Sequence, residues 1–321
     1  MSVLIFVDQA DGLIKKSSYE ALTYGVQLAE QIGVSAEAVV LGTVTDDLSA
    51  LGRFGVKKVY HVSNNLLDHL DTGVYTSTLA DVVKSRGADV LILSHNLTGR
   101  AIASRVAARL KAGLVTGAIA LPETSKGFVV KKSVFSGKAF ANINILTAIK
   151  IITLSPNSFT TISGEGKATV TQMDISIATP RVKVTSVNKV IGEVPLTEAS
   201  IVVSGGRGLK GPENWGMIED LAHVLHAATA CSRPVADANW RPHHEHVGQT
   251  GVQIAPDLYV AIGISGAIQH LAGVNRSKKI VVINKDAEAP FFKAADYGIV
   301  GDAFEIVPQL TKEIRKMNGI E

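Results

Sequence analysis

The segment from Leu258 to Asn284 constrains the fold of this chain more than any other stretch. It opens with a continuous apolar run, Leu258–Ile262, that has the length of a buried strand. Gly263 and Gly266 then allow a tight turn and a close approach of a ligand to the backbone. A short helix that begins near Ala267 would direct its unpaired amide groups and the positive end of its dipole across that turn. A second apolar run follows, so the segment predicts a strand, a glycine turn, a helix and a second strand that together hold an anionic, phosphorylated ligand.

The rest of the chain alternates strand and helix patterns in the way that specifies a mostly parallel sheet covered on both faces. With 321 residues, of which 46% are hydrophobic and 19% charged, the chain is long enough and apolar enough for two packed domains. We therefore expect an α/β fold with two Rossmann-like domains, of which the C-terminal one has a doubly wound parallel sheet.

The N-terminal half contains several strand candidates and two helices with N-terminal signals. Ser17, with Glu20 three residues later, is typical of a capping box and precedes apolar residues at helical spacing. Thr98 stands at the start of a second amphipathic segment and is expected to cap that helix. The apolar runs of strand length in this half are Val3–Val7, Val39–Leu41, Val56–Val62 and Val90–Leu93.

The pattern changes over residues 127–187 to short segments rich in Thr, Val, Ser and Gly, which indicate antiparallel additions or edge strands. Residues 188–199 contain a glycine and a proline and lack periodicity, so we expect a linker before the strand candidate Ile201–Ser204. The expected domains are therefore residues 1–188 and residues 189–321.

Composition and the N-terminus exclude several classes of protein. The net charge of +3 comes from 32 basic and 29 acidic residues without a long basic run, so nucleic-acid binding is not expected. The single cysteine, Cys231, excludes an internal disulfide and is expected to be a packed residue rather than a redox thiol. No apolar run approaches the roughly 20 residues that cross a bilayer. No signal or transit peptide precedes Val3–Val7, so we expect a bacterial cytoplasmic protein.

Gly206–Gly211 satisfies the G-x-G-x-x-G pattern directly after a strand candidate, which by itself suggests a nicotinamide dinucleotide site. Pro212 follows the last glycine and the next helix is expected only from about Asn214, so the pattern does not lead straight into a helix as that fingerprint requires. A stand-alone dinucleotide-dependent dehydrogenase is therefore the weaker alternative. Arg207 lies where open α/β sheets bind ligands, and its guanidinium suits phosphate or carbonyl oxygens, although a solvated loop arginine is the alternative.

Many positions with fixed spacing follow one another in the C-terminal part. They are Leu258-Tyr259, Gly263, Ser265-Gly266, Ile268-Gln269-His270, Gly273 and Ile283-Asn284, with Val247-Gly248-Gln249-Thr250-Gly251 upstream. This set resembles the signature of the electron transfer flavoprotein alpha subunit family. The close resemblance covers residues 200–321, and the N-terminal part matches only in layout. It implies a nucleotide-hydrolase-like N-terminal α/β domain and a C-terminal domain that binds FAD noncovalently.

The resemblance also implies which residues contact FAD. They are Arg207, Ser232, Arg233, Val247, Gly248, Gln249, Thr250, Ser265, Gly266, Ala267, Ile268, Gln269, His270, Asn284, Asp302 and Ala303. In this reading Arg233 lies against the isoalloxazine ring, where a fixed cation stabilises negative charge on the reduced flavin. Thr250 offers its hydroxyl to the N5 region, and His270 reaches the pyrimidine side of the ring. Asn284 and Asp302 hold the adenosine half.

A structural alternative exists for each of these side chains. Arg233 could pair with a helix dipole or a carboxylate, Thr250 could satisfy its own turn, and His270 could be a neutral core histidine. Asp302 could cap the last helix. The stretch Ala238–His246 contains three histidines and a glutamate, but their adjacency fits neither one helical face nor a separated pair of metal ligands. We expect a polar loop there that adjusts the flavin potential or partner docking.

The resemblance implies an electron carrier rather than an enzyme that transforms a substrate. The chain would form a heterodimer with a homologous beta subunit, which would hold AMP or a second FAD. Dehydrogenases such as those that oxidise acyl-CoA thioesters in fatty acid beta-oxidation would reduce the flavin, and a membrane-associated electron transfer flavoprotein quinone oxidoreductase would reoxidise it. A bifurcating type that oxidises NADH remains an alternative, as does a nonredox nucleotide-binding module.

Overall fold

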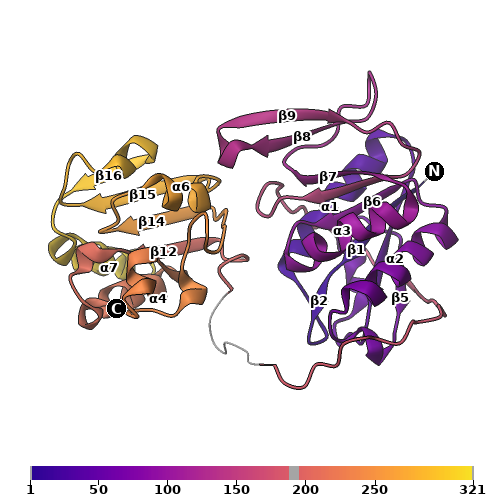
Figure 1. Ribbon diagram of the computed structural model, residues 1–321, viewed down its shortest axis with the longest axis horizontal. Helices are drawn as coiled ribbons and strands as arrows, with labels where there is room; N and C mark the ends of the chain where they lie inside the picture. Colours follow the sequence, from indigo (N-terminus) through magenta and orange to yellow (C-terminus); the bar gives the residue numbers. More distant parts are fainter. Residues whose placement is uncertain (1, 188–194, 320–321) are drawn as a thin grey trace. The chain divides into compact units, whose positions relative to one another are not determined.

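The structure of the chain is a computed structural model that describes residues 2–187 and 195–319. It divides into two compact units, Met1–Asn188 and Lys189–Glu321, and each is described by itself. Residues 188–194 of the expected linker lie outside the described residues. Figure 1 draws the N-terminal unit in indigo to magenta and the C-terminal unit in orange to yellow.

The N-terminal unit is built on one sheet, which has nine strands over its described residues. The strand order is β11-β5-β4-β1-β6-β10-β7-β8-β9, and neighbours are parallel except for β7 with β8 and β8 with β9. The strands are β1 (Ser2–Val7), β4 (Ser35–Leu41), β5 (Lys58–Val62), β6 (Val90–Ser94), β7 (Gly113–Ala118), β8 (Val129–Val134), β9 (Ala139–Asn144), β10 (Lys150–Leu154) and β11 (Thr169–Gln172). A separate small hairpin joins β2 (Gln9–Ala10) and β3 (Leu13–Ile14).

Helices cover both faces of this sheet because the central strands are apolar on both sides. On one face, Val3, Ile5 and Val7 pack in a core with α1 (Lys16–Gln31). On the other face, Leu4 and Phe6 pack with α2 (Thr72–Arg86) and α3 (Leu97–Leu110). This alternation along β1 is the period of two of a strand, and both sets of side chains are buried.

The expected helix caps of this unit are wrong, because the polar side chains bind elsewhere. Residue Lys15 precedes α1 without a side-chain cap, while the Ser17 hydroxyl accepts a hydrogen bond from Asn96 at 3.2 Å. The carboxylate of Glu20 accepts from the backbone of residue 157 instead of closing a capping box. Asn96, and not Thr98, caps α3 by accepting from the Gly99 amide at 2.9 Å.

The β-rich stretch at 127–187 contains the expected antiparallel addition, the hairpin of β8 and β9. The expectation fails for β10, which lies in the middle of the sheet and runs parallel between β6 and β7. Its Ile151 and Ile152 are fully buried on opposite faces, so this short segment is a core strand. β11 is an edge strand, as expected, and it runs parallel to its neighbour β5.

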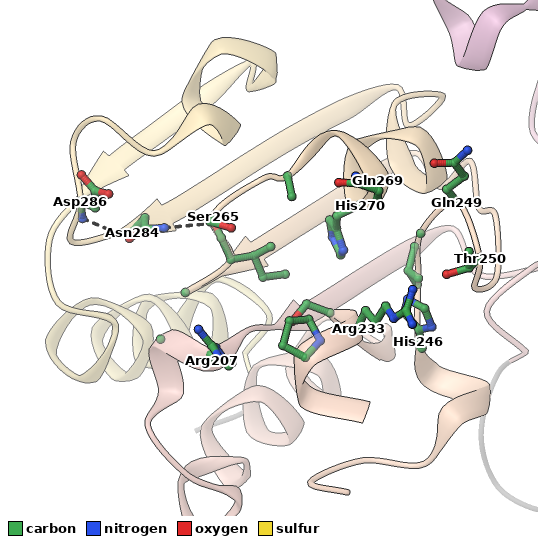
Figure 2. Close-up of a pocket in the computed structure, with 18 residues that line it drawn as sticks. Arg207, Arg233, His246, Gln249, Thr250, Ser265, Gln269, His270, Asn284 and Asp286 are labelled. Carbon is green, nitrogen blue, oxygen red and sulfur yellow. Dashed lines mark hydrogen bonds between the residues drawn. The ribbon is translucent and has the colours of Figure 1, made fainter. Parts of the chain in front are cut away.

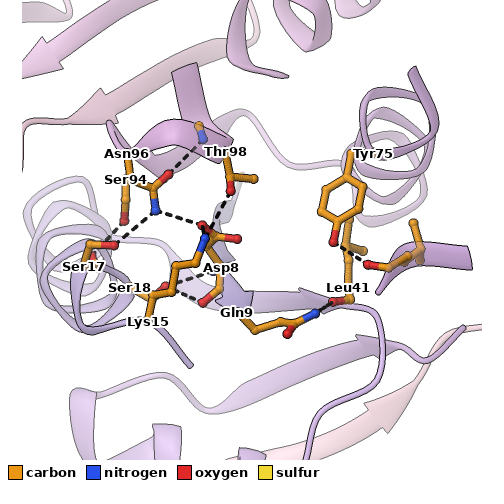
Figure 3. A network of polar contacts seen from close by, with 12 residues as sticks. Asp8, Gln9, Lys15, Ser17, Ser18, Leu41, Tyr75, Ser94, Asn96 and Thr98 are labelled. Atoms are coloured by element: carbon orange, nitrogen blue, oxygen red, sulfur yellow. Dashed lines mark hydrogen bonds and ion pairs between the residues drawn. The ribbon is translucent and has the colours of Figure 1, made fainter. Parts of the chain in front are cut away.

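A network of polar side chains lies at the carboxyl ends of β1 and β6 (Figure 3). The strand order reverses at this point, because β1 has β4 on one side and β6 on the other. The buried Asp8 carboxylate accepts hydrogen bonds from the Lys15 ammonium at 2.7 Å and from the Asn96 amide at 2.8 Å. The Asp8 backbone amide donates to the Ser18 hydroxyl at 2.9 Å. Side chains of the unit itself therefore fill the place where open α/β sheets bind ligands.

The C-terminal unit has a fully parallel sheet with the order β13-β12-β14-β15-β16. On one face the core includes α4 (Gly216–Val224), α5 (Arg233–Asp237) and α7 (Ala303–Met317), and on the other it includes α6 (Ile268–Val274). The strands are β12 (Ile201–Gly205), β13 (Ala228–Cys231), β14 (Leu258–Ile262), β15 (Lys279–Asn284) and β16 (Tyr297–Val300). The expected α/β class and the doubly wound parallel sheet are confirmed.

One strand of this sheet has no counterpart in the expected elements. It is β13, which ends at Cys231 shortly before α5 begins at Arg233. The segment Ala228–Cys231 consists of small side chains without a β-branched apolar residue, so it carries a weak strand signal. None of the described helices is long and apolar enough to span a bilayer.

Candidate functional site

Three adjacent strands of the C-terminal sheet end at the same level. Gly205, the last residue of β12, is paired with Cys231 of β13 on one side and with Ile262 of β14 on the other. Because β12 comes first in the chain and its two neighbours lie on opposite sides, the strand order reverses here. Ligands of open α/β sheets bind outside the carboxyl ends of the strands at such a point.

A cavity of about 540 Å³ lies at this end of the sheet (Figure 2). Its volume is within the usual range for sites that bind cofactors. Its walls are the loops that follow β12, β13, β14 and β15, together with the loop that precedes β14. The lining residues are Arg207, Gly208, Ser232, Arg233, Pro234, His246, Val247, Gly248, Gln249, Thr250, Gly263, Ile264, Ser265, Ala267, Gln269, His270, Asn284 and Asp286.

The loops after β12 and β14 touch through their backbones. A Cβ atom at Gly208 would lie 2.6 Å from the Cα atom of Gly263, and one at Gly206 would clash with the Gly263 carbonyl oxygen. Gly263 also has φ +62°, a left-handed conformation that side chains disfavour. The Gly208 amide donates to the Gly263 carbonyl at 3.0 Å, which fixes this contact. Glycine at these positions keeps the cavity wall at backbone level.

The side chain of Asn284, at the end of β15, holds the turn between β14 and α6. The Asn284 amide donates to the Ile264 carbonyl at 3.0 Å, and its oxygen accepts from the Asp286 backbone at 3.1 Å. Gly266, with φ +81°, passes so close to Phe291 that a Cβ would clash with it. The N-terminal end of α6 follows at Ala267, which provides no side-chain cap. This end of the helix therefore faces the cavity with backbone groups.

Two arginines bring positive charge to the cavity. Arg207 begins the 3-10 helix η4 (Arg207–Leu209), and Arg233 is the first residue of α5. The Arg233 guanidinium contacts Asp237 at 3.3 Å, but 64% and 56% of these side chains are exposed. An exposed pair of this kind contributes at most about 1 kcal/mol. The guanidinium is therefore available to a ligand at low cost.

His270 of α6 is a buried histidine with one free ring nitrogen. Its Nε2 is hydrogen-bonded to the Tyr259 hydroxyl at 2.8 Å, and only 7% of the residue is exposed. Nδ1 has no hydrogen-bond partner among the described residues. Burial, and then the charge of His246, lowers the pKa of His270 to about 4, while a contact with the Val247 backbone that falls short of hydrogen-bond geometry opposes this shift. The imidazole is neutral at pH 7 and presents an unsatisfied nitrogen to the site.

The histidine-rich stretch is divided between two environments. His243 and His244 are exposed in the 3-10 helix η6 (His243–Glu245), whereas His246 is buried and lines the cavity. The carboxylate of Glu245 is also buried and binds the Arg241 guanidinium at 2.6 Å. No group of three or more potential metal ligands occurs among the residues that the structure describes.

The thiol of Cys231 is fully buried at the end of β13. Burial, with a smaller contribution from the charge of Glu245, raises its pKa to about 12. A thiol of this kind rarely forms the reactive thiolate, so Cys231 has the character of a packed residue, as the sequence predicted.

Comparison with known proteins shows two matched family domains. Residues 3–178 match the electron transfer flavoprotein domain, and residues 195–275 match the electron transfer flavoprotein FAD-binding domain. The chain belongs to the electron transfer flavoprotein alpha subunit family. Its similarity to electron transfer flavoprotein subunit alpha of Syntrophomonas wolfei is 37% identity over 97% of this chain and 98% of that protein. The subunits from Bacillus subtilis and Thermoanaerobacterium thermosaccharolyticum are 36% and 37% identical, each over 98% of both chains.

The structure brings most of the residues predicted for the flavin site of this alpha-subunit family member to one cavity. Those that line it are Arg207, Ser232, Arg233, Val247, Gly248, Gln249, Thr250, Ser265, Ala267, Gln269, His270 and Asn284. Four predicted residues do not line it: Gly266, Ile268, Asp302 and Ala303. Gly266 shapes the turn and Ile268 is 60% exposed on α6. Asp302 caps α7 by accepting from the Phe304 amide at 2.9 Å, and Ala303 begins that helix.

Six lining residues were not among the predicted contacts: Gly208, Pro234, His246, Gly263, Ile264 and Asp286. Gly263 was recognisable as a turn glycine, and Gly208 as part of the glycine-rich loop. His246 belonged to a stretch whose role the sequence left open. Asp286 gave no signal, because it reaches the cavity only through the bend that Asn284 holds after β15.

Proposed function

We propose that this chain is the alpha subunit of a heterodimeric electron transfer flavoprotein and that its cavity holds FAD noncovalently. The observation that carries the proposal is the coincidence of this cavity with the switch point of a sheet inside the matched FAD-binding domain. When bound, FAD supplies one-electron and two-electron redox chemistry. The protein binds and orients the ring system and sets its surroundings.

The residues present fit this cofactor. The free Nδ1 of His270 is a buried polar atom that needs a partner, and the polar edge of a flavin ring provides one. The glycine contacts at Gly208 and Gly263 leave a wall of backbone groups that admits a flat or phosphorylated ligand. Arg207 and Arg233 supply positive charge for a diphosphate and for a reduced ring.

Within the proposal each side chain has a defined task. Arg233 lies beside the isoalloxazine ring and stabilises negative charge on it. Thr250, on the loop before β14, offers a hydroxyl that can donate or accept at the N5 region. His270 remains neutral and binds the pyrimidine side through Nδ1, while Tyr259 holds its other nitrogen.

The adenosine half of FAD is assigned to the part of the site near the end of β15 and the start of α7. Asn284 lines the cavity, although its amide already holds the turn at Ile264. Asp302 and Ala303 belong to this half in the proposal, with the second Asp302 carboxylate oxygen left for a ribose hydroxyl because Oδ1 caps α7. Gly266 and Ile268 contribute backbone contacts at the start of α6.

The N-terminal unit is proposed to bind a homologous beta subunit, which holds AMP or a second FAD. Exposed apolar side chains on and beside the hairpin of β8 and β9 support a partner here, because exposed apolar groups gather at interaction sites. They are Phe135, Phe140, Ile143 and Leu146, of which Phe135 is 80% exposed and Phe140 is 60% exposed. Acyl-CoA or other dehydrogenases are the proposed electron donors, a quinone oxidoreductase the acceptor, and the bacterial cytoplasm the location.

Coexpression with the beta subunit tests the proposal. The purified complex should be yellow, should show the absorption bands of oxidised flavin and should release FAD on denaturation. A correctly assembled complex that is colourless and does not take up added FAD would contradict it. Counting FAD and AMP in the same complex separates a single-flavin carrier from a bifurcating type, because the latter would contain two FAD molecules and accept electrons from NADH.

A further inference from the structure

His246 is a buried side chain of the cavity wall whose backbone is fixed on both sides. Its amide donates to the His243 carbonyl at 3.1 Å, and its carbonyl accepts from the Val252 amide at 2.8 Å. A β-bridge also joins His246 to Cys231 at the end of β13. The backbone of His246 is therefore anchored to the end of a strand, which places its imidazole at the site. Only 8% of the residue is exposed.

The imidazole lies across two glycines that leave room for it. A Cβ at Gly251 would lie 2.9 Å from Nδ1 of His246, and a Cβ at Gly248 would lie 3.3 Å from Nε2. The causes of its pKa shift are burial and nearby charges, without a hydrogen bond to the ring. Figure 2 shows the ring beside Arg233 at the same end of the cavity. The buried ring is therefore held at the wall of the ligand site.

Titratable groups near His246 come from several elements, and one of them is the Cys231 thiol of β13, whose raised pKa keeps it uncharged. Arg233 and Asp237 belong to α5, His243 to η6 and His270 to α6. Burial is the main cause that lowers the pKa of His246 below 6.5, followed by the positive charge of Arg233, while Asp237 opposes the shift. The imidazole is thus neutral at pH 7 while no anionic ligand lies beside it.

This inference rests on the proposed function. We propose that His246 is a proton-binding residue of the flavin site, neutral beside the oxidised flavin and protonated when reduction adds negative charge to the ring system. Arg233 supplies a permanent positive charge, and His246 supplies a second one only when the cavity needs it. The chemical class of the ligand that drives the uptake is a reducible, flat aromatic ring that becomes anionic.

The proposed uptake balances atoms and charge. Electrons leave the reduced donor dehydrogenase of the proposed function, which is oxidised, and the flavin that accepts them is reduced. One proton leaves water and forms an N–H bond at a ring nitrogen of His246, and no bond forms between the imidazole and the flavin. Because an anion in a buried site favours the protonated form of a neighbouring imidazole, the reduced state raises the proton affinity of His246.

Potentiometric titration of the heterodimer with bound FAD, from about pH 5 to pH 8, tests the proposal. Three forms are compared: the wild type, His246→Gln, which keeps a polar side chain without a titrating ring, and His244→Gln, which changes an exposed histidine of the same stretch. His246 would have a lower pKa beside the oxidised flavin and a higher pKa beside the reduced flavin. Between these two values, proton uptake changes the equilibrium constant for flavin reduction tenfold per pH unit, which shifts the midpoint potential of a one-electron couple by about 59 mV. His246→Gln should lose this part of the slope, and His244→Gln should retain it.

Equal slopes in the wild type and His246→Gln would overturn the proposal. A colourless wild-type complex would instead reject the FAD site itself, so the two failures are distinguishable. If His246→Gln does not retain FAD, an NMR titration of the labelled histidines in the wild type decides the question. The pKa of His246 should be higher in the dithionite-reduced complex than in the oxidised one, and equal values would refute the inference.

Discussion

Replacing Tyr259 with phenylalanine removes one hydroxyl from the interior of the C-terminal unit. That hydroxyl is fully buried and forms the 2.8 Å hydrogen bond to Nε2 of His270. The packing of the ring with Phe291, at 6.2 Å between centroids, needs no hydroxyl and should persist. Since the other nitrogen of His270 already lacks a protein partner, the variant leaves a buried imidazole with no hydrogen bond from the protein. The cost of leaving such a group unsatisfied is about 1–3 kcal/mol.

For a unit of this size, a loss of that magnitude corresponds to a fall in Tm of about 3–12 °C. Differential scanning calorimetry of the chain without added FAD measures it, read at the transition of the C-terminal unit. Tyr297→Phe is the matched control, because Tyr297 lies in the same sheet and is 63% exposed. If Tyr259→Phe lowers Tm no more than Tyr297→Phe does, the hydrogen bond to His270 has no energetic role and the reasoning is refuted.

Three further predictions follow from the site. The pKa of His270, which is about 4 in the folded chain and 6.5 in the reference state, means that the unfolded chain binds more protons between these values. The free energy of unfolding should therefore fall as pH decreases through this window, by about 2 kcal/mol from pH 7 to pH 5. Denaturant titrations that give His270→Gln the same pH dependence as the wild type would contradict this prediction. Arg233→Ala should retain FAD but lower the midpoint potential of the flavin by roughly 60 mV, which is a tenfold loss of preference for the reduced form. Arg233→Lys should recover most of this potential, and identical potentials for the wild type and Arg233→Ala in a redox titration would exclude a role for the charge. Gly263→Ala places a Cβ 2.9 Å from the Gly208 Cα at a residue with φ +62°, with a backbone cost of about 1–2 kcal/mol, so Tm and FAD content should both fall. In the control Gly216→Ala, the added Cβ meets nothing within 4 Å, so neither Tm nor FAD content should change.

The C-terminal fold could be predicted because its strongest signals are local. Leu258–Ile262 is apolar throughout, as a strand buried on both faces must be, and the glycines after it mark a turn that no other residue adopts easily. The side chains around this turn come from consecutive βα loops. A sheet order that reverses at β12 then brings these loops to one edge, so a pattern along the chain becomes a cavity.

Other features depended on contacts that are distant in sequence. The caps of α1 and α3 were misassigned because Ser17 and Asn96 interact with each other across the switch point, 79 residues apart. The strand β13 consists of small residues and is recognisable only beside β12. His246 looked like one of three equivalent histidines, and only the β-bridge to Cys231 separates it from its exposed neighbours.

Because of the Asp8–Lys15 pair, the switch point of the N-terminal sheet differs in charge and in openness from the switch point of the C-terminal sheet. In the C-terminal unit the crevice beyond the strand ends is open and carries arginines. In the N-terminal unit an ammonium group of the chain already neutralises the carboxylate there, and a phosphate would meet the negative charge of Asp8 as soon as Lys15 moved aside. Because the Asp8 carboxylate is buried, it would be left without its counter-charge if Lys15 moved away. At this switch point the described residues of the N-terminal unit therefore repel a phosphate, whereas the arginines of the C-terminal cavity attract one.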